Sequence, residues 1–426
     1  MTMPTDSALS FRRRDYVKIT IFGFAVTALW QSLHSIILPL RLLDIVPEAQ
    51  KNTYLGWLTF FGLLLALAVQ PVAGAISDRS GFKWGRRRPY ILIGSITALL
   101  VIPGIGLAGS FAAIFAVYCL LQAATNTAQG PYQAFIPEFV PENKRGLASG
   151  VKALLEVVGG VILVYLASIF MDRYSAGEGS RWLWLVLGIL ATVLLAAMLA
   201  TVIWVKEAPA GAASRRDSFL PELFRTLREA LANRAIVWFL VSRLLVYMAF
   251  TTIQQFALYF LRDVIGVANP AESTARFSIF AVAGMLLVVW PAGYLSDRIG
   301  RRPISITAGL LGALGIGIIV LTKEYNTILG AAVIIGMAMG AFNSSNWALA
   351  TDLAAKGEEA RYLGIANMAT AGGAALARAI GPVIDFFNDR SPLLGYDVML
   401  LFCLAYFVIG GALIFKVKQR VLTEPR

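Results

Sequence analysis

Two ionisable residues, Lys152 and Glu156, lie four positions apart in an otherwise apolar stretch of the sequence. At this spacing their side chains share one face of a helix, so the ammonium and carboxylate groups can form an ion pair. Charged groups in such apolar segments are costly and usually serve a function. We therefore expect Glu156 to bind and release a proton, and Lys152 to be shared between Glu156 and an anionic solute. The alternative is a static, structural ion pair.

Polar side chains also recur at helical spacing in four other apolar stretches. Steps of three, four or seven residues return to the same helix face, so each set forms one stripe. Polar groups in apolar helices usually face a bundle interior or water, and we expect these stripes to line a central cavity that binds a polar solute. Amides that merely join helices are the alternative. The stripes contain Thr27, Gln31 and His34; Gln122, Asn126, Gln129 and Gln133; Arg243, Tyr247 and Gln254; and Asn343, Asn346 and Trp347.

Buried cations add information about the solute. Arg243 is expected near the middle of its helix, and Arg378 and Asp385 are seven residues apart, on one face of another helix. Together with Lys152, these arginines favour a solute that carries negative charge or many hydroxyl groups. His34 is the second candidate for proton binding, because an unperturbed histidine titrates near neutral pH.

The two halves of the chain share a loop motif. Residues 74–89 read GAISDRSGFKWGRRRP and residues 293–303 read GYLSDRIGRRP, about half the chain apart. We expect the two aspartates to end helices, where a carboxylate can contact a loop arginine and the N-terminus of a neighbouring helix. A weaker echo pairs residues 138–148 with residues 352–364. The residues expected to form gates are Asp78, Arg79, Arg86, Glu138, Arg145, Asp297, Arg298, Arg301, Asp352 and Arg361.

These residues must be positioned by helices that cross a membrane. Of the 426 residues, 58% are hydrophobic and only 15% are charged, whereas soluble domains carry about a quarter charged residues. Apolar runs that can span a hydrocarbon core of ~30 Å fall in two groups of six on either side of a polar segment, 206–233. The runs lie near 17–40, 54–77, 89–108, 111–136, 147–171, 182–205, 235–261, 275–296, 303–322, 327–350, 362–385 and 397–416.

The sequence therefore predicts an all-α membrane protein with twelve transmembrane helices in two six-helix bundles, related by a pseudo-two-fold repeat. The expected bundles are 1–205 and 234–426, and the expected linker, 206–233, contains an amphipathic surface helix. Most of the 37 lysines and arginines lie in segments that share one side of the membrane with the N-terminus. Because cytoplasmic loops carry the excess of positive residues, both termini are expected in the cytoplasm.

Several kinds of site are excluded by the composition. One histidine and two cysteines, Cys119 and Cys403, cannot supply a histidine-cluster or cysteine metal centre. The net charge of +12 is distributed over short gaps between apolar runs, so we expect no nucleic-acid partner. The sequence contains no nucleophile–base pair and no phosphate-binding loop, and we expect no enzymatic activity and no cofactor.

The repeated loop resembles the helix 2–3 motif of the major facilitator superfamily, Gly-x-x-x-Asp-Arg-x-Gly-Arg-Arg. The insertion 80–84 and the segment 130–138, GPYQAFIPE, are similar to the glycoside–pentoside–hexuronide:cation symporters and the related sucrose transporters. This resemblance implies a cavity lined by helices 1, 4, 7 and 10, and loop aspartates that hold the cytoplasmic side shut. Melibiose-type members carry acidic residues in helices 1, 2 and 4. Their absence here argues against a sodium site of that type.

The expected function is therefore secondary active transport of a small polar solute, sugar-like or an organic anion, coupled to H⁺ and working by alternating access. The protein is expected to act as a monomer in a bacterial inner membrane. One alternative is an efflux antiporter for drugs or lipids, although the amide-rich stripes argue against it. The other is a non-transporting assembly or sensor protein on the same fold, because fold does not determine function.

Overall fold

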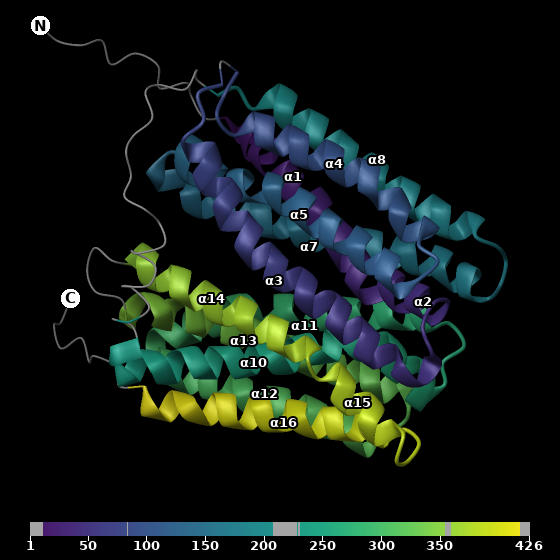
Figure 1. Ribbon diagram of the computed structural model, residues 1–426. Coiled ribbons are helices and arrows are strands. Elements are labelled where there is room, and N and C mark those ends of the chain that lie inside the picture. Colours follow the sequence, from purple (N-terminus) through teal and green to yellow (C-terminus); the bar gives the residue numbers. More distant parts are fainter. Residues whose placement is uncertain (1–11, 83, 208–227, 229–230, 354–358, 418–426) are drawn as a thin grey trace, which may run out of the picture. The chain divides into compact units, whose positions relative to one another are not determined.

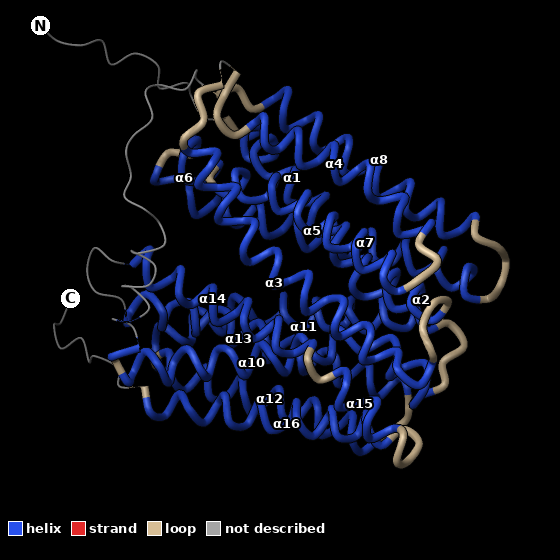
Figure 2. Tube along the Cα trace, in the orientation of Figure 1, coloured by secondary structure: helices blue, strands red, loops and turns tan. Residues whose placement is uncertain are grey.

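The computed structural model describes residues 12–82, 84–207, 228, 231–353 and 359–417. Within these ranges the chain is built of helices and contains no strand (Figure 2). Eleven of the described helices are long and apolar enough to cross a membrane. A helix satisfies its backbone hydrogen bonds internally, which an apolar segment needs in lipid. The prediction of an all-α membrane protein is confirmed.

The first compact unit comprises the described residues of 1–33 and 61–215. In this unit α1 packs against α7 and α8, and α4 packs against α5 and α8 (Figure 1). The C-terminal part of α3 (Lys51–Asp78) also belongs here. The other helices are α1 (Arg13–Ser32), α4 (Arg88–Leu107), α5 (Phe111–Gln133), α6 (Phe135–Phe139), the short 3₁₀ turn Glu142–Lys144, α7 (Arg145–Ser175) and α8 (Arg181–Trp204).

The second unit comprises the described residues of 34–60 and 216–426. Here α10 packs against α14 and α16, and α12 packs against α13 and α16. The long helices of this unit are α10 (Arg234–Phe260), α11 (Pro270–Ile299), α12 (Arg301–Leu321), α13 (Tyr325–Leu353), α14 (Glu359–Arg378) and α16 (Leu394–Leu413). Its short helices are α2 (Leu38–Leu43), α15 (Gly381–Asn388), the π-helical turns Leu33–Ile37 and Leu261–Ile265, and the 3₁₀ turns Glu48–Gln50 and Ile414–Lys416.

The two units use the same pattern of helix pairs. If α1, α4, α5, α7 and α8 correspond in order to α10, α12, α13, α14 and α16, each of the four main pairs of the first unit recurs in the second. The sequence repeat is therefore also a repeat of packing, which is the arrangement typical of two-bundle transporters.

The two compact units are not separated only at the boundary that follows the sixth long helix. The chain also crosses between them near its N-terminus. α3 is one continuous helix, yet residues 51–60 group with the second unit and residues 61–78 with the first. The chain also passes from the first unit to the second within the π-helical turn Leu33–Ile37, which follows α1. The expected bundle limits, 1–205 and 234–426, stay a prediction. Most of the expected linker helix in 206–233 lies outside the described residues.

One expected helix is interrupted. The predicted span 362–385 is two helices, because α14 ends at Arg378 and α15 begins at Gly381. Pro382 has no N–H to donate to the carbonyl of Arg378, so the helix cannot continue through this turn. A Cβ atom at Gly381 would collide with the carbonyl oxygen of Asn52, which only glycine allows so close. The expectation that Arg378 and Asp385 share one face of a continuous helix is therefore wrong.

Candidate functional site

The second unit contains a fully buried arginine. Arg243 is on α10, and its side chain has 0% exposure. Its Nε donates to the Thr370 hydroxyl at 2.7 Å and to the carbonyl oxygen of Ala366 at 3.1 Å. Its Nη1 donates to Oδ1 of Asn346 at 2.5 Å. All these acceptors are neutral. Three helices, α10, α13 and α14, therefore meet around one guanidinium group.

Aromatic rings flank this guanidinium group. Its central carbon lies 4.3 Å from the ring centroid of Trp347 and 5.2 Å from that of Tyr247. Both distances allow a cation–π interaction, which becomes stronger when water is excluded. The Tyr247 hydroxyl donates to Oδ1 of Asn343. Thus five residues of the predicted stripes on α10 and α13 lie together: Arg243, Tyr247, Asn343, Asn346 and Trp347. With Thr370 of α14, which accepts from Arg243, they form what we call the Arg243 cluster.

Other residues predicted to bind solute in this unit lie outside the Arg243 cluster. Gln254 is half-buried on α10. His34, in the π-helical turn, is half-buried and lies within electrostatic range of buried Arg378. Nη1 of Arg378 donates to the carbonyl oxygen of Ala374, one turn earlier in α14. Thr370 of the Arg243 cluster was not predicted, because a single hydroxyl in an apolar helix gives no pattern.

In the first unit, Lys152 and Glu156 face each other on α7. The Lys152 Nζ atom lies 3.8 Å from Oε1 of Glu156, and both side chains are partly exposed. The ammonium group also lies 5.2 Å from the ring centroid of Tyr132 on α5. The Tyr132 hydroxyl donates to the carbonyl oxygen of Thr20 on α1 at 3.0 Å. The pair expected from spacing therefore forms, and it lies where α1, α5 and α7 meet.

Gly23 of α1 makes this meeting point possible. A Cβ atom at position 23 would lie 2.5 Å from Oε1 of Glu156 and 2.7 Å from the Tyr132 hydroxyl. Real Cβ atoms do not approach oxygen so closely, so a larger residue would displace the carboxylate. The sequence pattern did not indicate this role, because a glycine within a helix has many possible causes.

The polar stripe on α5 forms hydrogen bonds within its own helix. Nε2 of Gln122 donates to the Tyr118 hydroxyl at 2.9 Å. Asn126 is buried and donates to both the backbone oxygen and the Oε1 atom of Gln122. Farther along, Gln129 is half-buried and Gln133 is exposed, and Gln31 on α1 is half-buried. The stripe therefore runs from buried to exposed along α5.

The first loop motif forms an ion cluster at the start of α4. Arg87, whose side chain is 5% exposed, pairs with Asp78 at the end of α3 and with Glu138 in α6, the latter at 2.5 Å. Burial lowers the pKa of Arg87, but the hydrogen bonds and charges of Glu138 and Asp78 outweigh it and raise the pKa above the usual value. Arg86, the predicted residue, also reaches Glu138 at 2.7 Å, but its side chain is 42% exposed. We call Asp78, Arg87 and Glu138 the first loop cluster.

The second loop motif has the same construction. Arg301, at the start of α12, pairs with Asp297 in α11 and with Asp352 in α13, the latter at 3.4 Å. The next arginines also correspond: Arg88 donates to the carbonyl oxygen of Val202 in α8, and Arg302 donates to that of Phe415 after α16. Aligning the two motifs on Pro89 and Pro303, rather than on their glycines, would have identified Arg87 as the counterpart of Arg301.

The remaining predicted gate residues have different surroundings. Arg145 donates to the carbonyl oxygen of Pro137 at 2.7 Å, which holds the turn between α6 and α7. Arg79 is exposed, and the guanidinium of Arg298 lies 4.5 Å from the Tyr294 ring centroid. The side chain of Arg361 lies outside the described residues.

A second polar network, which the sequence did not indicate, lies at the start of α3 within the second unit. Lys51 Nζ pairs with Asp263 at 2.7 Å, and the Tyr396 hydroxyl donates to the same carboxylate at 2.5 Å. Asn52 Nδ2 donates to Asp385 at 2.8 Å. We call these residues, Lys51, Asn52, Asp263, Asp385 and Tyr396, the Lys51 network. Its members come from three separate parts of the chain, 51–52, 263 and 385–396, so no spacing rule connects them.

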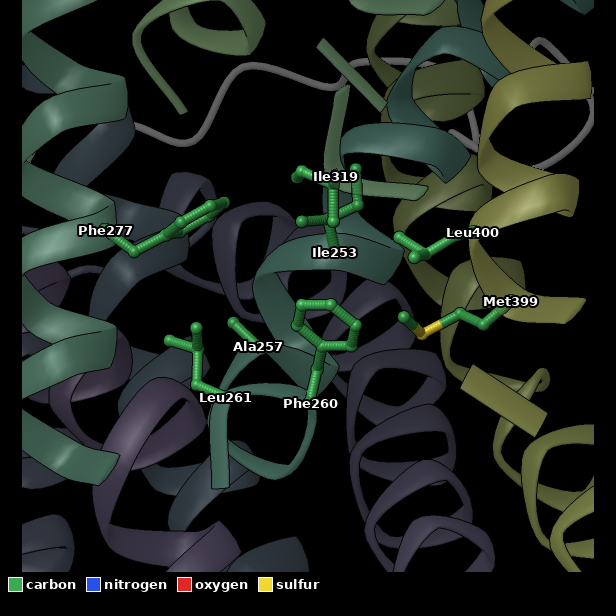
Figure 3. Close-up of a pocket in the computed structure, with 8 residues that line it drawn as sticks. All are labelled: Ile253, Ala257, Phe260, Leu261, Phe277, Ile319, Met399 and Leu400. Atoms are coloured by element: carbon green, nitrogen blue, oxygen red, sulfur yellow. The ribbon is translucent and has the colours of Figure 1, made fainter. Parts of the chain in front are cut away.

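The void drawn in Figure 3 is not a solute site. It lies in the second unit and has a volume of only about 10 Å³. Every side chain around it is apolar, and a water there would have no polar partner. The lining residues are Ile253, Ala257, Phe260, Leu261, Phe277, Ile319, Met399 and Leu400.

Comparison with known proteins gives a family match along nearly the whole chain. The family model described as MFS/sugar transport protein matches residues 21–416. Sucrose transport protein SUC3 of Arabidopsis thaliana is 28% identical over 154 residues, which is 31% of this chain and 24% of that protein. Multidrug resistance protein MdtG of Escherichia coli O9:H4 (strain HS) is 25% identical over 316 residues, which is 72% of each chain. The chain spans about a quarter of the length of the first curated relatives that it matches.

Solved structures give the same fold at low sequence identity. The crystal structure of the nucleoside transporter NupG matches with a TM-score of 0.74 at 13% identity, over 94% of this chain and 98% of that one. At this identity the match establishes the fold alone.

Proposed function

Because the chain belongs to the MFS/sugar transport protein family, we propose that it is a secondary transporter that carries a small polar solute by alternating access. The observation that carries this proposal is the pair of matching loop clusters. In the first unit, Arg87 at the start of α4 pairs with acidic residues of α3 and α6. In the second unit, Arg301 at the start of α12 pairs with acidic residues of α11 and α13. Such clusters can release and re-form as helices separate, which is the motion that alternating access requires.

The coupling ion of this proposal is a proton, and Glu156 is the group that carries it. The carboxylate is not fully buried within the protein, and the ammonium group of Lys152, at 3.8 Å, stabilises its ionised form. Protonation of Glu156 removes the negative charge beside the Lys152 ammonium, which keeps its contact with the Tyr132 ring and becomes available to an anionic group. Proton binding is thus linked to the availability of a cation for the solute.

The wider setting of the proposal is a monomer in a bacterial inner membrane, with both termini in the cytoplasm. No cofactor takes part in it. Sucrose transport by SUC3 supports a sugar-like solute, and the amides of the stripes on α5 and α13 are suitable partners for hydroxyl groups.

Transport by the purified protein in liposomes tests the proposal. A panel of sugars, uronates and organic acids is first screened by thermal shift, and each stabilising solute is then assayed under an imposed pH gradient. We expect accumulation that collapses when the gradient is dissipated. Glu156→Gln should abolish accumulation and retain counterflow exchange, because exchange needs no net proton movement.

Glu178→Gln is the matched control, because Glu178 is exposed in the connection between α7 and α8. It should accumulate solute as the unmodified protein does. If Glu156→Gln accumulates solute normally, Glu156 is not the group that couples transport to protons, and His34 is the next candidate. If no solute of the panel is accumulated or exchanged, the transport function itself is wrong.

Drug efflux is the second candidate, and one observation favours it. The similarity to MdtG covers 72% of each chain, a longer stretch than the similarity to SUC3. An exporter would expel lipophilic cations such as ethidium from inverted vesicles, and these compounds would stabilise the protein in the same thermal-shift screen. Stabilisation by polar solutes alone would exclude this candidate.

A further inference from the structure

The Arg243 cluster contains a buried positive charge that its own surroundings do not neutralise. Among the described residues, no carboxylate lies within ion-pair distance of Arg243, whose three acceptors are an amide, a hydroxyl and a backbone carbonyl. The flanking rings of Trp347 and Tyr247 supply only partial negative charge. A buried charge without a counter-charge costs several kcal/mol. Such a cost is tolerated where a charge serves a function.

Two donor nitrogens of the cluster also have no acceptor in the described structure. They are Nη2 of Arg243 and Nδ2 of Asn346, and both are buried. The two side chains are joined through Nη1 and Oδ1, so the free nitrogens belong to one hydrogen-bonded pair. The orientation of the Asn346 amide follows from its partner, because a guanidinium group has no acceptor and must face Oδ1. Nδ2 is thereby directed away from Arg243 and remains available.

This set of free groups has a definite chemical complement. It offers a positive charge and N–H donors on two adjacent side chains, and no free acceptor. A carboxylate offers a negative charge, two acceptor oxygens and no donor, and it fits the fork of a guanidinium group. A neutral sugar hydroxyl can accept one of these hydrogen bonds but leaves the charge unbalanced.

We propose that the transported solute carries a carboxylate, which binds Nη2 of Arg243 and Nδ2 of Asn346 while its ring or chain lies against Trp347. This inference rests on the proposed transport function and narrows its substrate class from polar solutes to organic anions such as uronates. Trp347, Tyr247 and Asn343 are half-buried around the fully buried guanidinium, so the solute enters past partly exposed side chains. Arg243 is itself fully buried, and it becomes accessible to the solute when α10 moves against α13 or α14 during transport.

One test needs no solute at all. Asn346→Asp replaces the amide that faces Arg243 with a carboxylate. The side chain at position 346 then supplies the negative charge that the solute would otherwise bring. We expect this variant to have a higher melting temperature than the unmodified protein. Asn126→Asp is the matched control, since Asn126 is also buried but donates to the neutral side chain and backbone of Gln122, and it should melt at a lower temperature. If Asn346→Asp melts lower as well, the charge of Arg243 is already balanced and the inference is wrong.

A second test uses matched solutes that differ in charge. Sodium glucuronate and glucose are titrated against the purified protein at equal ionic strength, with sodium chloride as the reference, and binding is followed by thermal shift and tryptophan fluorescence. We expect glucuronate to bind at least about tenfold more tightly than glucose. The preference should disappear in Arg243→Gln and in Asn346→Asp, and Arg243→Lys should retain only part of it because the fork is lost.

The outcomes separate this inference from the proposed function. Transport of neutral sugars with no preference for uronates or other carboxylates would overturn the anion site and leave the transport function standing. Retention of the anion preference by Asn346→Asp would also overturn it. Uptake of carboxylates that requires Arg243 would support both.

Discussion

The carboxylate of Asp385 in α15 accepts a hydrogen bond from the backbone N–H of Thr53, 332 residues earlier in the chain, at an N–O distance of 2.6 Å. Thr53 is in the first turn of α3, where backbone N–H groups have no partner within the helix. Asp385 therefore caps α3 from another segment of the chain, and its negative charge meets the positive end of the helix dipole. It also accepts from Nδ2 of Asn52 at 2.8 Å and is only 5% exposed.

The cap should be measurable as stability. Asp385→Asn retains one acceptor oxygen but loses the charge, and we expect the free energy of unfolding to fall by about 1 kcal/mol. Asp385→Ala leaves buried donors without an acceptor and should cost about 3 kcal/mol. Melting temperatures of the purified variants in detergent check the predicted order, with Asp385→Ala lowest and Asp385→Asn between it and the unmodified protein. Asp389→Asn, at an exposed position one turn later, is the control and should melt unchanged.

Lys51 and Asp263 should behave as a coupled pair. Both side chains are largely buried, with 8% and 15% exposure, and their charged atoms are 2.7 Å apart. Removing the ammonium in Lys51→Ala leaves the carboxylate buried, and we expect a loss of about 3 kcal/mol of stability.

A double-mutant cycle checks this expectation. The second change, Asp263→Asn, should cost less in the Lys51→Ala background than in the unmodified protein, because the uncompensated charge is then removed. Equal costs in both backgrounds would mean that the two residues do not interact energetically. The cycle needs only four melting curves.

The approach of α1 to Glu156 predicts a strong effect of one methyl group. Gly23→Ala places a Cβ atom 2.5 Å from Oε1 of Glu156, so the carboxylate must move. We expect a loss of about 1–3 kcal/mol in stability and a reduced accumulation of solute in the liposome assay. Gly160→Ala is the matched control on α7. Its Cβ atom would meet Gln31 at 3.6 Å, an ordinary contact, and the variant should melt at or above the unmodified temperature.

The two adjacent loop arginines should differ sharply. Arg87→Gln breaks a buried ion cluster with Asp78 and Glu138, and we expect it to cost about 3 kcal/mol. Arg86→Gln removes a half-exposed partner of Glu138, which should cost less than about 1 kcal/mol. The comparison uses melting temperatures of the two variants at the same ionic strength. Equal losses would show that the cluster depends on net charge in the loop rather than on the geometry of Arg87.

Several features follow from the sequence alone because they depend on neighbours along the chain. The lengths of the apolar runs predict the helices, and four-residue spacing places Lys152 beside Glu156, at 3.8 Å in the structure. The repeated loop motif predicts that Asp297 and Arg301 lie together, since they are one turn apart on either side of a helix junction. Helical periodicity is a local property, so a sequence pattern is sufficient to read it.

Tertiary structure decides which of these helices meet and what their side chains face. The Arg243 cluster joins residues more than 100 positions apart, as Arg243 with Asn346 and with Thr370. The sequence predicted Arg86 as the gate residue, but the buried arginine of the first loop cluster is Arg87. Only the fold determines which of two adjacent side chains is buried. The break in the span 362–385 has a local cause in Pro382, but the close approach of Asn52 to Gly381 at that break is decided by packing. These outcomes depend on close packing between segments that are remote in sequence, and no periodicity along a single chain encodes that packing.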